Sequence, residues 1–197
     1  MMVSITRCCR SWLERLLIII VLAGAGLAHA GSIEPVHAAL KPGEDGHVLS
    51  AEFSIDLGSR LEEAVARGVP LYFNLEFTLE HNRWYWLNEQ VASITITYRL
   101  AYNALTRQYR LSFGGLHQSF TTLGEALRVI SRVSALPVAD KGVLKSGEIY
   151  AAALRLSLDR NQLPKPLQVD AIANSDWQVS SKALRWQFYQ QPESVIK

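Results

Sequence analysis

Apolar and polar residues alternate along several stretches of the chain, a pattern typical of β-strands that bury one face. The clearest case is residues 71–80, whose apolar positions are Leu71, Phe73, Leu75, Phe77 and Leu79. Similar alternation predicts four more strands, at 47–57, 94–102, 109–113 and 150–158. Because short turns join several of these stretches, we expect antiparallel pairing, with one face on a core and the other in water.

Turn residues predict how the strands connect. Residues 41–46 lie between the strand at 47–57 and one expected at 33–40, which is the arrangement of a hairpin. Residues 103–106 form a second such turn, whereas Gly114 and Gly115 are expected to break the sheet. Shorter strands are expected near the C-terminus, at 168–172 and 183–189.

Two short helices are predicted between the strands. Ser59 is expected to cap a helix over residues 60–67 that ends at Gly68. Thr122 and Glu125 have the spacing of a capping box, so a second helix is expected from there to about Ser134. Its apolar residues fall on one side, which predicts that this helix packs against a sheet rather than between two layers.

These elements predict a mainly β fold. No internal repeat or long linker divides residues 31–197, so we expect a single globular domain. The expected architecture is an antiparallel β-sandwich or curved sheet of about seven or eight strands, with two short helices.

Residues 1–30 have the layout of a secretory signal peptide. Three arginines precede an apolar run of 12 residues at 16–27, and the small residues Ala28 and Ala30 flank His29. Cleavage is therefore expected between Ala30 and Gly31, with export to the periplasm by the general secretory route. The alternative is an uncleaved segment that anchors the protein in the inner membrane, although spanning a bilayer takes about 20 apolar residues.

Cleavage would leave a neutral domain without cysteine. Both cysteines, Cys8 and Cys9, lie in the signal segment, and 17 basic and 17 acidic residues follow it. A neutral domain gives no support to nucleic-acid binding. The charge is uneven, because residues 31–95 carry 4 basic and 10 acidic residues and residues 96–197 carry 13 and 7. We expect strands from the two halves to interleave and their fields to cancel; the alternative is a surface with an acidic and a basic side.

No pattern in the sequence predicts catalytic, cofactor or metal chemistry. The histidines after residue 30 are His37, His47, His81 and His117, and none has a second His or Cys beside it. There is no serine in a Gly-x-Ser-x-Gly elbow. Glu76 and Glu80 share a strand face about 13 Å apart, too far to flank one bond, and are expected to be solvated.

One group of charged residues is a candidate interaction surface. Arg99, Arg110 and Arg155 fall on the polar side of three predicted strands. Arginine makes bidentate, planar contacts with carboxylates, so this face is suited to an acidic protein surface; scattered solvated charges are the alternative. Tyr85 is expected to point outward between Trp84 and Trp86, which suit either a core pair or a binding platform.

Several segments together resemble a known family. They are residues 67–71 (RGVPL), 83–86 (RWYW), 98–100, 102–110, 122–127, 158–160, 163–167 and Trp177. Over nearly the whole chain after residue 30, this combination is similar to the exported proteobacterial family catalogued as domain of unknown function 4390. The resemblance implies no activity. It suggests a membrane sensor kinase of the nitrogen-regulation type as a genomic neighbour, not as a demonstrated contact.

The sequence thus favours a non-enzymatic periplasmic or envelope domain that binds another protein. The expected partner is an envelope or inner-membrane protein, and a sensor kinase is the one that the resemblance suggests. Two other classes stay open: a carrier of a small ligand or lipid, which needs an enlarged apolar cavity, and a hydrolase, which needs convergent polar groups. No cofactor is expected, and the oligomeric state is open.

Overall fold

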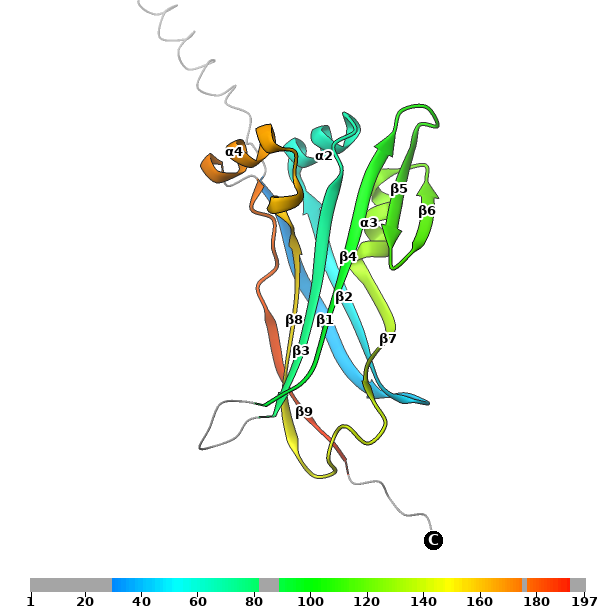
Figure 1. The fold of residues 1–197 in the computed structure, drawn as a ribbon, viewed down its shortest axis with the longest axis vertical. Coiled ribbons are helices and arrows are strands. Elements are labelled where there is room, and N and C mark those ends of the chain that lie inside the picture. The colour runs from blue at the N-terminus through cyan, green and yellow to red at the C-terminus, as the bar shows by residue number, and fades with distance from the viewer. Residues whose placement is uncertain (1–29, 82–88, 175–176, 192–197) are drawn as a thin grey trace, which may run out of the picture.

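The computed structural model describes residues 30–81, 89–174 and 177–191, which form nine strands in two antiparallel sheets (Figure 1). The smaller sheet has the order β1-β2-β7, with bounds Ala30–Pro42, Gly46–Leu57 and Arg132–Asp140. The larger has the order β6-β5-β4-β3-β8-β9, with bounds Leu116–Phe120, Gln108–Phe113, Glu89–Asn103, Leu71–His81, Ile149–Leu158 and Leu184–Tyr189. The predicted mainly β fold is confirmed.

The core lies between the two sheets, and β3 runs through its centre. The predicted apolar positions of β3 are all buried, and β3 pairs with β4 on one side and β8 on the other. β2 supplies the facing layer through Leu49, Ala51, Phe53 and Leu57, which are also buried. Alternation therefore predicted the inward residues of both layers correctly.

β1 and β2 form the predicted hairpin, with one irregularity and one close approach. The pairing register shifts between Pro35 and His37, as in a β-bulge. At the start of β1, a Cβ atom on Gly31 would overlap the carbonyl oxygen of Leu57. Only glycine allows the two backbones to lie this close.

The first predicted helix is present as α2 (Gly58–Ala66), but its predicted cap is wrong. Leu57 is the N-cap residue and Ser59 lies inside the helix, because α2 follows β2 directly. Near the helix start, Asp56 Oδ1 accepts a hydrogen bond of 2.9 Å from the Gly58 N–H. Gly68 ends the helix as predicted, with a φ of +89° and its N–H donating to the Val65 carbonyl.

The second helix, α3 (Leu123–Ser131), has the predicted capping box but ends early. Thr122 Oγ1 accepts from the Glu125 N–H at 3.3 Å, and Glu125 Oε2 accepts from the Thr122 N–H at 3.2 Å. Arg132 already has extended backbone and begins β7. Val133 lies within the predicted helix but instead pairs with Ala51 of β2, so tertiary pairing overrides the local pattern.

Two more predictions fail. The strand expected at 168–172 is part of helix α4 (Lys165–Ala173), which follows a short 3₁₀ helix, η1 (Arg160–Gln162). Proline is compatible with a first helical turn, and the Leu167 N–H donates to the Pro164 carbonyl at 2.9 Å. Gly114 and Gly115 do not break the sheet either; they connect β5 to β6. The strand expected at 183–189 is confirmed as β9.

The elements divide the molecule into two ends and a corner (Figure 1). α2 and α4 lie at one end of the strands, and the β7–β8 connection lies at the other. α3 packs beside β5 and β6 and also contacts β2 and β7. We call β5, β6 and α3 together the β6 corner (residues 108–131).

Candidate functional site

The predicted arginine face exists, but its three members are not equally close. By register, Arg99 pairs with Ser112 and Arg110 pairs with Ala101, so these arginines lie on neighbouring strands, with Cα atoms about 8 Å apart. Arg155 pairs with Glu76 and lies about 16 Å from Arg99. All three are exposed on the outer face of the larger sheet, and their role as an interaction surface stays a prediction.

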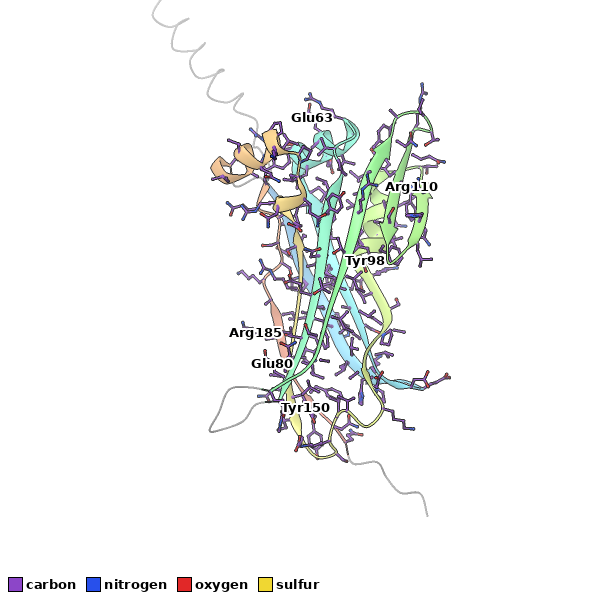
Figure 2. The ribbon with its side chains drawn as sticks, in the orientation of Figure 1. Glu63, Glu80, Tyr98, Arg110, Tyr150 and Arg185 are labelled. Carbon is purple, nitrogen blue, oxygen red and sulfur yellow. The ribbon has the colours of Figure 1, made fainter. Side chains whose placement is uncertain are left out.

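Arg99 and Arg110 differ in what holds them. Arg99 Nε donates to the Tyr72 hydroxyl at 3.1 Å, and its guanidinium lies 6.0 Å from the centre of that ring. Arg110 projects from β5 within the β6 corner (Figure 2). Within the described residues, no hydrogen bond or ion pair restrains the Arg110 side chain, so this guanidinium can meet a partner without giving up a contact.

The aromatic part of the predicted surface cannot be placed. Tyr85, with Trp84 and Trp86, lies outside the described residues. Glu76, by contrast, is exposed on the outer face of β3, as expected for a solvated carboxylate.

β6 is an edge strand, which the sequence did not predict. Its hairpin turn consists of Gly114 and Gly115 with φ of +50° and +83°, the two positive values that a type I′ turn requires. In such a hairpin the residues beside the turn exchange hydrogen bonds, and the pairs then alternate. The N–H and C=O groups of His117 and Ser119 therefore point away from β5. Within the described residues, no strand pairs with β6 on that side.

A groove of about 720 Å³ runs between β6 and α3. One wall is the end of β6, with Ser119, Phe120 and Thr121. The other wall is formed by Glu125, Arg128 and Val129, which share one side of α3, and by Arg132, the first residue of β7. Phe120 and Val129 are half-buried, and Arg128 is exposed, so an apolar floor adjoins a cationic rim.

The chain segment that contains the β6 corner is rich in arginine, although the carboxylates of Glu52, Glu62 and Glu63 lie beside that corner. Residues 96–139 contain five arginines and one carboxylate, Glu125. The Glu125 carboxylate accepts hydrogen bonds from the Thr121 hydroxyl and from the Thr121 and Thr122 N–H groups, and these bonds hold its pKa below the ordinary value. Arg132 Nε lies 3.2 Å from Glu52 Oε1. Arg128 has no ion-pair partner in the described part of the chain.

Interleaving of the two halves is therefore only partial. As expected, β7 pairs with β2, β8 pairs with β3, and β9 pairs with β8, so second-half strands lie next to first-half strands. β5, β6 and α3 instead lie together at one corner, and they carry two arginines, Arg110 and Arg128, and one carboxylate, Glu125. The charge pattern of the sequence indicated this surplus but not its position.

A polar cluster at the opposite end was also missed. The Tyr150 hydroxyl accepts from the Lys145 N–H at 2.8 Å and donates to Glu148 Oε2, which lies 3.4 Å from His81 Nε2. Burial raises the pKa of Tyr150, which is 2% exposed. These bonds tie the β7–β8 connection to β3 and β8. Figure 2 shows Tyr150 far from Arg110.

His47, buried on β2, belongs to the same end. Its Nε2 lies 2.7 Å from Oε1 of Gln190. Its ring packs edge-on against Phe188, with the ring centres 5.5 Å apart. A hollow of about 580 Å³ adjoins it. Among the residues described, no three or more His, Cys, Asp or Glu side chains converge as metal ligands would. None of the described helices has the length and apolar character needed to cross a bilayer.

Comparison with known proteins identifies a family. The family described as Domain of unknown function (DUF4390) matches residues 30–187, which is most of the chain. No curated protein and no solved structure matches it. The match spans both sheets and all of the β6 corner, so the fold described above is that of the whole matched region.

Proposed function

Because the chain belongs to the family described as Domain of unknown function (DUF4390), whose description assigns no activity, we propose a function from the geometry of the β6 corner. The protein is a non-enzymatic binding module. It takes up an extended segment of a partner protein by adding it as a strand to the open edge of β6.

The observation that carries this proposal is an open strand edge beside a groove. His117 and Ser119 offer backbone donors and acceptors at the edge, and α3 provides a facing wall with Val129 and Arg128. Backbone hydrogen bonds supply affinity in this mode of recognition, and the groove selects the side chains. Edge strands are commonly protected by lysine, proline or a bulge. β6 (LHQSF) contains no charged residue or proline, and its pairing with β5 has an unbroken register.

Two observations support binding over the other function classes. A carrier needs an enlarged apolar cavity between the sheets, whereas fully buried Phe73, Phe77 and Leu75 occupy that space. A hydrolase needs polar groups that converge on a substrate. In the polar cluster at the far end, Tyr150, Glu148 and His81 contact one another instead.

We propose further that the protein acts outside the cytoplasm, after removal of residues 1–30, on an envelope or inner-membrane partner. The support is the signal-like layout of those residues and, for a sensor kinase, the family resemblance alone. N-terminal sequencing of protein from the cell envelope should begin at Gly31. Recovery of the full-length chain from the membrane would favour the anchored alternative.

The binding mode can be tested with one backbone N–H. Peptides are selected from a displayed library of random heptapeptides on the purified protein, and their affinities are measured by calorimetry for Ser119→Pro and Ser119→Ala. Proline removes the outward N–H but is tolerated on an edge strand, because that group bonds nothing in β5. We expect Ser119→Pro to weaken binding at least about tenfold, the effect of a net loss of about 1.4 kcal/mol.

Ser119→Ala is the matched control, since it keeps the N–H and loses only the hydroxyl. It should bind like the original protein, and both variants should unfold at nearly the original temperature. Failure to select any peptide, or equal binding by the proline variant, would overturn the proposed function.

A further inference from the structure

The partner segment has a definite chemistry. We infer that it is acidic, with one carboxylate facing Arg110 on the outer face of the sheet and another facing Arg128 at the rim of the groove, beside an apolar side chain over Phe120 and Val129. This inference rests on the proposed function, because it describes the occupant of the same edge.

The first step concerns the outer face. Arg110 pairs with Ser119, so both side chains lie on the outer side of the β5–β6 ladder. A strand added to β6 would place its backbone about 10 Å from that of β5, two strand spacings away. Ser119 is small and lies between them, so the long Arg110 side chain can reach over it toward an acidic residue of the added strand. Opposite charges on adjacent strands stabilise pairing.

The second step concerns the groove. Alternate residues of an added strand would face α3 instead, where Val129 and Phe120 are half-buried and accept an apolar side chain. Arg128 is exposed immediately beside Val129 on the helix. Arg132, at the start of β7, is paired with Glu52, and Glu125 is held by its own capping hydrogen bonds. Arg128 is thus the charge that a ligand in the groove meets.

The same charges disfavour the obvious competing occupant. A second copy could pair its own β6 with this edge, but its segment LHQSF contains no acidic residue. Such pairing would also bring two sets of Arg110 and Arg128 together, and like charges across adjacent strands are destabilising. An acidic segment of another protein satisfies both the edge and the charge.

The test is reversal of charge at these two positions. Peptides selected on the original protein should be enriched in Asp and Glu, and their binding should weaken as salt rises. Arg110→Glu and Arg128→Glu should each weaken that binding about tenfold or more. A new selection on the double variant should enrich Lys and Arg. Arg185→Glu is the matched control, because it changes the same charge on the same sheet face, opposite Ala153 and four strands away from β5.

The possible outcomes distinguish failure of this inference from failure of the proposed function. Peptides that depend on the Ser119 N–H but show no acidic enrichment, and bind the reversed variants equally, would overturn the inference and leave the proposed function standing. If no peptide binds, both the proposed function and the inference are overturned. A dimer of the protein in solution that Ser119→Pro abolishes would make a second copy the occupant and would also overturn the inference.

Discussion

β3 and β6 belong to the same sheet but differ in almost every physical respect. β3 pairs on both sides and buries five apolar side chains in the core. β6 pairs on one side, and four of its five residues are exposed. Buried area therefore concentrates stability in β3, while unpaired backbone groups give β6 the means to bind. One sheet thus separates the strand that holds the fold from the strand that we propose binds a partner.

The largest effect should come from the centre of β3. Phe73→Ala or Phe77→Ala removes a fully buried ring and should lower the free energy of unfolding by about 3 to 5 kcal/mol, measured by chemical denaturation. Glu76→Ala, on the outer face of the same strand, should change it by less than about 0.5 kcal/mol. Equal sensitivity at the two faces would mean that β3 is not the one-sided core strand described.

A smaller effect is expected at the turn that leads into β6. Gly115 has a φ of +83°, so Gly115→Ala should destabilise the protein by about 1 to 2 kcal/mol and weaken peptide binding with it. Gly124 in α3 is the control, because its φ is not positive and a Cβ atom there meets no other atom within 4 Å. Gly124→Ala should be neutral or stabilise by up to about 1 kcal/mol. Loss of stability in both would point to helix packing rather than the turn.

The smallest effect concerns pH at the start of α3. Hydrogen bonds from Thr121 and Thr122 lower the pKa of Glu125 in the folded protein, so its contribution is complete above the unfolded-state pKa and disappears as pH falls through the folded-state pKa. Glu125→Gln keeps an acceptor for the capping box and cannot titrate. Thermal unfolding of the two proteins should differ at neutral pH and converge in acid. A constant difference would exclude this origin.

The difference between β3 and β6 also explains which parts of the fold the sequence predicts. Phe73, Phe77 and their neighbours mark β3 because a buried face leaves a period of two. β6 leaves no such mark, since exposed His117, Gln118 and Ser119 need no apolar alternation. β7 was hidden for another reason: Val133 continues the apolar stripe of α3, and only pairing with β2 makes it a strand.

The candidate site was predictable only in part. Alternation placed Arg110 on the outer face, and the capping box placed Glu125 at a helix start. Arg128 and Ser119 were not identified, because their importance depends on α3 lying beside the edge of β6. That proximity arises from tertiary packing, which no local pattern in this sequence reports.

The close approach of Gly31 to Leu57 bears on whether cleavage or folding of the β1–β2 hairpin comes first. The predicted cleavage bond, between Ala30 and Gly31, joins the first two residues of β1, and pairing with β2 begins at Ser32 opposite Asp56. A peptidase needs that bond in accessible, extended chain. If residues 1–30 are removed as we propose, removal has to precede closure of the β1–β2 hairpin, because a molecule that folded first would shield the bond to be cut.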